Sequence, residues 1–234
     1  MLNLLKEELQ KFANPEKAGI FKKFFKRGSG EYAEEDIILG ISAPEQRKIA
    51  ERYFDLSLDN LQELINSRIH EHKLTALLIL IHKYSKADEL LKKQIFDFYL
   101  KNAKNINNWD LVDLSAPNIL GNFLLYKDKK ILYNLAKSDN LWERRISILS
   151  TFYFIRHGQF EETVNISKLL LTDEHDLIHK AVGWMLREIG KRDQKRLEQF
   201  LIQHYKNMPR TMLRYAIEKL NPKKRQQYLK GEIK

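Results

Sequence analysis

The stretch HKAVGWMLREIG, residues 179–190, decides the fold class of this chain. Four apolar residues recur here at spacings of three and four, which places them along one side of a helix. They are Ile178, just before the stretch, and Val182, Met185 and Ile189 within it. Three other stretches share this plan of a polar start and a crowded apolar middle: EHKLTALLILIHKY (71–84), NWDLVDLSAPNIL (108–120) and ERRISILSTFYFI (143–155). Four such helices predict an all-α protein.

These stretches also predict a repeat. Lys73, Trp109 and Arg145 follow one another at intervals of 36 residues, and Glu143 and His179 are separated by the same interval. Helical hairpins that repeat every 35–45 residues, roughly, are typical of HEAT-like or armadillo-like solenoids. We therefore expect residues 1–234 to form a single curved domain with an extended concave face.

Helical spacing of apolar residues extends over most of the chain, and no long stretch alternates as a strand would. Capping residues and prolines mark many helix starts, for example Asn14-Pro15, Ser57 and Asn221-Pro222. The one long irregular stretch is residues 27–42. The predicted helices are 2–12, 15–26, 43–55, 57–66, 69–84, 88–104, 108–115, 117–126, 129–138, 140–157, 160–172, 175–191, 193–207, 209–220 and 222–230.

Composition narrows the class of protein. The 234 residues include no cysteine, which excludes disulfides, zinc thiolate sites and cysteine nucleophiles. The N-terminus carries charge every few residues, unlike a signal peptide or membrane span, so we expect an intracellular protein. The formal net charge of +10, from 41 Lys and Arg against 31 Asp and Glu, favours polyanions as partners, although a merely basic surface would read the same way.

A second side of the 179–190 helix carries cations around an aromatic ring. Lys180, Trp184, Arg187 and Lys191 share this side, which is distinct from the apolar one. Cations bind phosphates, and a flat indole can stack on a base or sugar, so the pattern indicates a nucleic-acid surface. The alternative is that Trp184 lies at the edge of the core with lysines extending past it.

In INNWDLVDLSAP, residues 106–117, Trp109 and Asp113 are four residues apart and share one helix face. Pro117 should end or kink the helix near Ala116, which would leave Asp113 in its last turn. A carboxylate there opposes the helix dipole at a cost of about 0.3–1 kcal/mol, and such a placement points to function. The alternatives are an ordinary ion pair of Asp113, or a helix that continues through a kink.

Arg144 and Arg145 stand near the start of the helix in NLWERRISILS, where cations also oppose the dipole. Phosphate binding, with help from nearby free N–H groups, would explain both; ion pairs with Glu143 or with an acid of a neighbouring repeat are the alternative. We expect no metal, since the pairs His175/His179 and His70/His72 lack an evident third ligand. No phosphate-binding Gly-rich loop and no Gly-x-Ser-x-Gly motif occurs.

Taken together, NNWDLVDLSAP, DNLWERRISIL and DLIHKAVGWMLREIGK closely resemble the AlkD-like DNA alkylation repair family, the HEAT-like alkylpurine DNA glycosylases. The similarity extends from LGISAPEQR (39–47) to MPRTMLRYAIEKL (208–220). It implies a helical solenoid whose concave basic face holds duplex DNA and a hydrolase that removes cationic N3- or N7-alkylated purines without a cofactor.

The resemblance also implies roles for single residues. Asp113 would be the catalytic carboxylate, flanked by Trp109 and Trp184. Arg145 would hold the DNA backbone near the lesion, and Tyr32 would match a lesion-side tyrosine of the family. The patterns of the residues themselves add four further candidates for binding the DNA backbone beside Arg145. These are Arg144, Lys180, Arg187 and Lys191.

Three functions compete at this point. The first is a monofunctional glycosylase acting in base excision repair, expected to be a cytoplasmic, nucleoid-associated monomer bound to double-stranded DNA without metal or membrane. The second is a non-catalytic HEAT-like protein that binds damaged or unusual DNA. The third is a scaffold for protein partners. Asp113 with two tryptophans favours the first, and the cations around Trp184 favour DNA over a protein partner.

Overall fold

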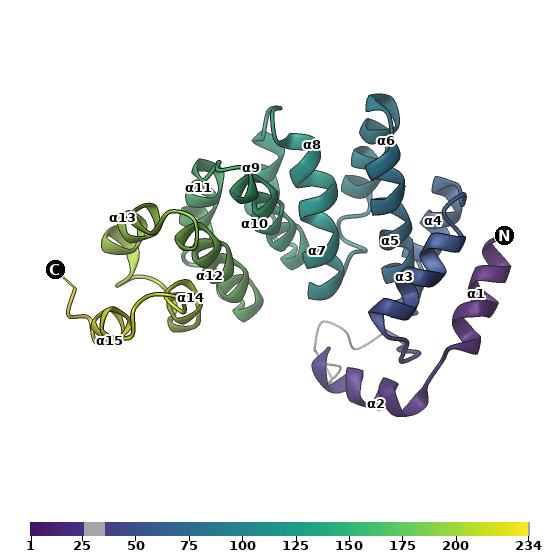
Figure 1. Cartoon of the computed structure of the whole chain (residues 1–234), viewed down its shortest axis with the longest axis horizontal. Helices are drawn as coiled ribbons and strands as arrows, with labels where there is room; N and C mark the ends of the chain where they lie inside the picture. Colours follow the sequence, from purple (N-terminus) through teal and green to yellow (C-terminus); the bar gives the residue numbers. More distant parts are fainter. Residues whose placement is uncertain (26–35, 234) are drawn as a thin grey trace. The chain divides into compact units, whose positions relative to one another are not determined.

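The computed structural model describes residues 1–25 and 36–233, without the side chains of residues 22–24 (Figure 1). This part of the chain is all-α, as predicted, and its only extended pairing is one bridge between Ile37 and Ile69. No helix in it is long and apolar enough to cross a membrane. The elements are α1 (Leu2–Lys11), α2 (Pro15–Phe24), α3 (Ala43–Arg52), α4 (Leu58–Ile65), α5 (His70–Lys86), α6 (Glu89–Lys101), α7 (Trp109–Ala116), the π-helix η1 (Pro117–Gly121), α8 (Asn122–Leu124), α9 (Lys130–Ala136), α10 (Leu141–Arg156), α11 (Glu161–Leu169), α12 (Asp176–Gly190), α13 (Gln194–His204), α14 (Arg210–Ala216) and α15 (Pro222–Lys230).

Local chemistry explains where many of these helices begin. A side-chain oxygen of the residue before the helix accepts a hydrogen bond from an early backbone N–H group, which would otherwise lack a partner. Ser42 and Glu45 form a reciprocal capping box at α3. Residues that cap in the simpler way are Asn14, Ser57, Asp88, Asn140, Asp193 and Asn221.

The sequence predicts that Pro117 ends or kinks the helix near Ala116; the α-helical turns of α7 do end there, but the chain continues directly in a wider helical turn. Pro117 begins the π-helix η1, whose flanking residues Ala116 and Asn122 both have right-handed helical backbone angles. The missing N–H of a proline removes one helical hydrogen bond, and here a wider turn carries the helix past it. Helical backbone therefore continues past Ala116, and Asp113 does not oppose a free helix C-terminus there.

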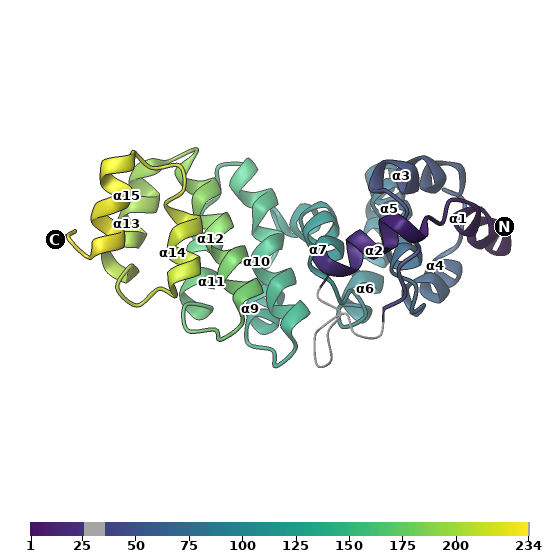
Figure 2. The same ribbon diagram turned by 90° about the horizontal axis from the view of Figure 1, so that it is seen from below.

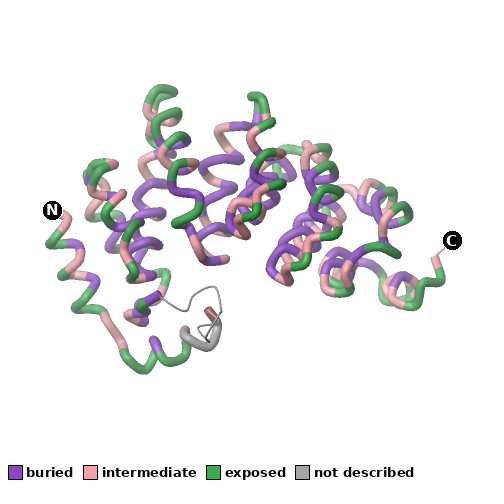
Figure 3. The backbone as a smooth tube through the Cα atoms, turned by 180° about the vertical axis from the view of Figure 1, so that it is seen from behind, coloured by how far each residue is buried: buried purple, intermediate pink, exposed green. Residues whose placement is uncertain are grey.

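The chain divides into two compact units, Met1–Ser115 and Ala116–Lys234. In the first unit, α5 packs against α1, α3, α4 and α6 and buries most of its apolar residues, with Leu77, Ile79 and Leu80 fully buried. In the second unit, α10 and α12 are central: α10 packs against η1, α9, α11 and α12, and α12 against α13 and α14 (Figure 2). Buried positions gather where these helices face one another (Figure 3).

Two glycines bring helices of the second unit unusually close. A Cβ on Gly183 would lie 2.5 Å from the Met212 carbonyl oxygen and 2.6 Å from the Tyr215 Cβ. Gly121 meets Ser150 and Tyr153 in the same way, at 2.3 and 2.8 Å. Each residue of the first set follows its counterpart in the second by 62 positions. The contact of η1 with α10 therefore recurs as the contact of α12 with α14.

The 36-residue register predicted from the sequence is wrong in detail. Lys73 is the fourth residue of α5, Trp109 the first of α7 and Arg145 the fifth of α10, so the three do not occupy equivalent turns. The helices and connections differ in length from one hairpin to the next, and a fixed interval cannot follow them.

Candidate functional site

Helix α7 presents Trp109 and Asp113 on its open side. Both side chains are partly exposed, whereas Leu111 and Val112 between them are fully buried. The Asn108 side chain accepts a hydrogen bond from the Trp109 backbone N–H at 2.8 Å. The i, i+4 pair therefore lies on one accessible face of α7, where a ligand could meet an aromatic ring and a carboxylate together.

The inner side of α7 is held by a buried chain of hydroxyl groups. The Tyr99 hydroxyl lies 2.7 Å from the Ser115 hydroxyl, which donates to the Leu111 carbonyl at 2.5 Å. Burial raises the pKa of Tyr99 well above its ordinary value, and the negative charge of Asp113 acts in the same direction. Tyr99 therefore stays a neutral donor on the side of α7 that faces α6.

Helix α12 has the two sides that the sequence predicts. Its apolar residues Ile178, Val182, Met185 and Ile189 are fully buried. The α12 row, by which we mean Lys180, Trp184, Arg187 and Lys191, is partly or fully exposed. The indole of Trp184 packs against Phe152 of α10 with ring centroids 5.6 Å apart, so it lies at the edge of the core and still faces outward.

Acidic side chains accompany every cation of the α12 row. Lys180 donates to Asp176 at 2.8 Å, Arg187 pairs with Glu218, and Lys191 donates to Glu188 at 2.5 Å. Glu188 is 6% exposed and also accepts from the Trp184 indole N–H at 3.2 Å. The sequence reading missed Glu188, although its position one turn after Trp184 was a usable signal.

Arg144 and Arg145, in the first turns of α10, bond to residues at and just before the start of α12. Arg144 pairs with Asp173 at 2.6 Å and donates to two backbone carbonyls, which confirms the ion-pair alternative. Arg145 is 4% exposed and donates to the Leu177 carbonyl at 2.5 Å. The sequence predicts free N–H groups here that could bind a phosphate. Two early N–H groups of α10 instead donate to the Asn140 side chain. Contact of either arginine with DNA stays a prediction.

The remaining candidates are quickly placed. Tyr32 lies outside the described residues. His175 caps α12 and the His179 ring faces the Asp173 carbonyl. In residues 1–25 and 36–233, no three His, Cys, Asp or Glu side chains gather as a metal site would require.

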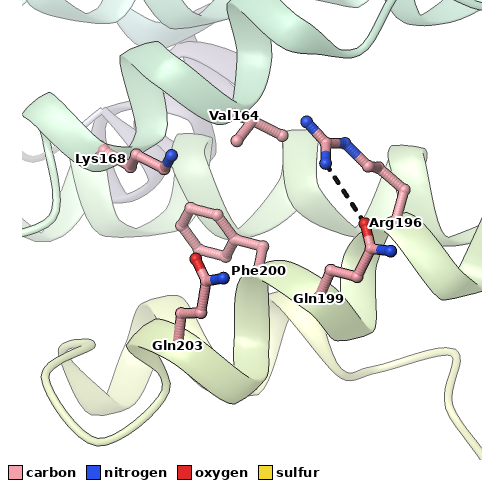
Figure 4. Close-up of a pocket in the computed structure, with 6 residues that line it drawn as sticks. All are labelled: Val164, Lys168, Arg196, Gln199, Phe200 and Gln203. Carbon is pink, nitrogen blue, oxygen red and sulfur yellow. Dashed lines mark hydrogen bonds between the residues drawn. The ribbon is translucent and has the colours of Figure 1, made fainter.

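A pocket of about 290 Å³ between α11 and α13 contains none of the candidate residues (Figure 4). Val164 and Phe200 are its apolar lining residues, and Arg196, one of its cations, is paired with Glu161 at 2.6 Å. The candidate residues therefore lie on the accessible faces of α7 and α12 and not in this pocket.

Comparison with known proteins agrees with the all-α repeat fold. Residues 5–220 match the family described as DNA alkylation repair enzyme. A solved structure described as a predicted DNA alkylation repair enzyme from Enterococcus faecalis is similar with a TM-score of 0.69 and 16% identity, over 90% of this chain and 97% of that one. No curated protein matches.

Proposed function

The chain belongs to the DNA alkylation repair enzyme family, and from that premise we propose that it is a monofunctional DNA glycosylase. Its substrates are cationic N3- or N7-alkylated purines in duplex DNA, and its reaction is hydrolysis of the N-glycosidic bond. It acts as a monomer without a cofactor, on the DNA of the cytoplasm.

The observation that carries this proposal is the pair of Trp109 and Asp113 on the open face of α7. An N3- or N7-alkylpurine carries a positive charge and leaves as a neutral base, so the reaction needs no strong general acid. Charge instead develops on the sugar as the bond breaks. A fixed carboxylate stabilises this cation and orients the attacking water, whose oxygen bonds to C1′ while its proton goes to solvent or to the carboxylate.

Trp109 supports the same reaction. A tryptophan face attracts a cationic nucleoside by about 0.5–2 kcal/mol, and the attraction weakens once the base becomes neutral. In the second unit, the α12 row offers another indole among three cations, a combination suited to a DNA backbone. Arg145 and Arg144 remain candidates for the same backbone role.

Base release tests the proposal most directly. A duplex oligonucleotide with one N7-methylguanine is incubated with wild type and with Asp113→Asn, and free base is measured under single turnover. We expect release by wild type and a loss of at least about 100-fold in the variant, with little change in affinity. Asp97→Asn is the matched control, because Asp97 is an exposed carboxylate of α6 paired only with Lys93 among the described residues.

Two results contradict the proposal. Turnover by Asp113→Asn at the wild-type rate removes the catalytic role of that carboxylate. No release by either protein, with tight and salt-sensitive duplex binding, identifies a non-catalytic DNA-binding protein instead.

A further inference from the structure

The first turn of α5 is an unusual set of four consecutive buried polar residues, which we call the α5 cluster: His70, Glu71, His72 and Lys73. Their exposed fractions are 2, 1, 7 and 7%. Burying polar groups is costly unless each finds a partner. The partners of the α5 cluster lie in three different segments of the first unit, so the cluster joins them.

Two of the four residues have local, structural partners. The Glu71 carboxylate accepts hydrogen bonds from the backbone N–H groups of Leu39, Gly40 and Ile41, at 2.9, 2.8 and 3.3 Å. The His72 ring lies 3.0 Å from the Ser67 hydroxyl. Neither side chain has a described contact with α7.

The other two residues reach the start of α7. The Lys73 ammonium donates to Asn107 at 2.7 Å and to Asp36 at 2.9 Å. His70 Nε2 donates to the Asp110 carboxylate at 2.8 Å. Asn107 and Asp110 stand on either side of the α7 start, so α5 holds this turn at two points.

The His70 ring faces two carboxylates. Its Nδ1 lies 4.0 Å from Asp36 Oδ2, which is too far for a hydrogen bond, and neither atom has a hydrogen-bond partner among the described residues. The backbone brings these groups together, because the His70 N–H donates to the Ile37 carbonyl at 2.9 Å. The two carboxylates Asp36 and Asp110 are thus balanced by two positive charges, those of Lys73 and of a protonated His70. A neutral His70 ring has only one N–H, so its other nitrogen would direct a lone pair toward one of the two carboxylates.

Protonation agrees with the electrostatics of the site. Burial by itself lowers the pKa of His70, but the charge and hydrogen bond of Asp110, with the charges of Glu71 and Asp36, outweigh it and raise the pKa above the ordinary value. The charged groups that face His70 are therefore Asp110 on α7, Asp36 before α3, and Glu71 and Lys73 on α5. The end of α2 contributes Phe25, which is uncharged.

Phe25 completes the link to the candidate site. Its ring centroid lies 4.6 Å from that of His70 and 5.8 Å from that of Trp109. Asp110, the hydrogen-bond partner of His70, directly follows Trp109 in the chain. The imidazole therefore reaches Trp109 by two routes, through the backbone at Asp110 and through the Phe25 ring.

We propose that protonated His70, bound to Asp110 and packed against the Phe25 ring, is a positioning residue that sets the orientation of Trp109 on α7. This role rests on the proposed function for its importance in base release, but the positioning itself is measurable without substrate. Loss of the proton weakens the tie to both carboxylates, so Trp109 loses its fixed orientation as pH rises through the pKa of His70.

Fluorine NMR tests the positioning directly. The chain has three tryptophans, so the protein labelled with 5-fluorotryptophan gives three signals, assigned by Trp109→Phe and by the corresponding single variants. We expect the Trp109 signal to shift with pH in wild type and to lose that shift in His70→Gln, which keeps a donor toward Asp110 without a charge. Asp110→Asn should remove it as well.

His72→Gln is the matched control, a second buried histidine in the same turn whose partner is Ser67. It should leave the pH dependence of Trp109 as in wild type. Far-UV circular dichroism identifies any variant that is not folded, and Asp110→Asn then replaces His70→Gln as the test. A Trp109 signal that does not shift in wild type, or shifts equally in His70→Gln, overturns the proposal.

Base release adds a readout that separates this proposal from the function. We expect the single-turnover rate of wild type to fall as pH rises through the His70 pKa, and that of His70→Gln to be about tenfold lower at low pH and flat, with duplex affinity unchanged in both. If wild type releases no base, the function fails while the fluorine signals still judge the positioning. If base release is normal in His70→Gln at every pH, the importance of this positioning for base release is overturned while the function stands.

Discussion

At the scale of single residues, Glu188 is the acidic partner to which the α12 row is tied, and any phosphate that binds this row would meet it. Its buried carboxylate pairs with Lys191 at 2.5 Å and with Arg192 at 3.5 Å, and it accepts the indole N–H of Trp184. A phosphate approaching these cations must compete with a carboxylate already in place. Glu188 therefore orients Trp184 and lowers the positive charge of the surface at the same time.

This arrangement predicts opposite effects of two substitutions on duplex binding. Glu188→Gln keeps an acceptor for Trp184 but frees cations, so affinity should rise and the slope of log K against log salt should steepen by about 0.9 per cation gained. Lys180→Ala should weaken binding and flatten the slope by about the same amount. Fluorescence anisotropy across a salt series measures both.

Glu198→Gln provides the control for this comparison. Glu198 is a partly buried carboxylate that is likewise paired with a lysine, but it lies on α13 and its partner is Lys224 at 2.6 Å, outside the α12 row. Its slope should equal that of wild type. A slope for Glu188→Gln no steeper than for Glu198→Gln would show that Glu188 does not restrain the cations.

At the scale of elements, the close approach of helices in the second unit depends on the absence of a side chain at Gly183. The Met212 carbonyl and the Tyr215 Cβ, both on α14, occupy the space that a Cβ would need. Backbone atoms of a packed helix cannot move aside singly, so any substitution must separate α12 from α14. The recurrence at Gly121 against α10 makes this contact a feature of the repeat.

Gly183→Ala should lower the free energy of unfolding by about 1–3 kcal/mol, although alanine is the better helix former by about 1 kcal/mol. Gly19→Ala is the matched control, because Gly19 lies exposed within α2 with no atom within 4 Å of an added Cβ. That variant should be as stable as wild type or more so. Urea unfolding followed by circular dichroism compares them, and a Gly183→Ala protein of wild-type stability would contradict the close contact.

At the scale of the whole molecule, two neighbouring histidines make the stability of the Met1–Ser115 unit depend on pH in opposite ways. Burial lowers the pKa of His72 to about 4, with a further contribution from Lys6. The unfolded chain then binds a proton between about pH 6.5 and 4 that the folded chain does not, so stability falls as pH falls through this range. His70, with its raised pKa, stabilises at low pH and loses that contribution as pH rises through its folded value.

His72→Gln should therefore reduce the loss of stability between pH 6.5 and 4.5. The slope that one proton contributes is at most about 1.4 kcal/mol per pH unit. Urea unfolding at several pH values measures the slope, and hydrogen exchange locates the difference in peptides of residues 1–115 rather than 116–234. An unchanged slope in His72→Gln would mean that this histidine is not the group that titrates.

The sequence alone determined what depends on near neighbours along the chain. Helix spans, the caps at Asn14 and Ser57, and the two sides of α12 follow from a period of 3.6 residues and from bonds within a turn. The pair of Trp109 and Asp113 was found for the same reason, as a spacing of four on one helix face. The roles of these two side chains, and the reach of the α12 row toward DNA, stay predictions.

Tertiary structure decided the partners of the charged groups. His70 with Asp110, Arg144 with Asp173 and Arg187 with Glu218 join residues about 30 to 40 positions apart. No local spacing identifies such partners, because the lengths of intervening helices and connections determine which acid meets which cation. The same holds at Pro117. Local preference alone would end the helix before this proline, but η1 begins there as a π-helical turn and packs against α10.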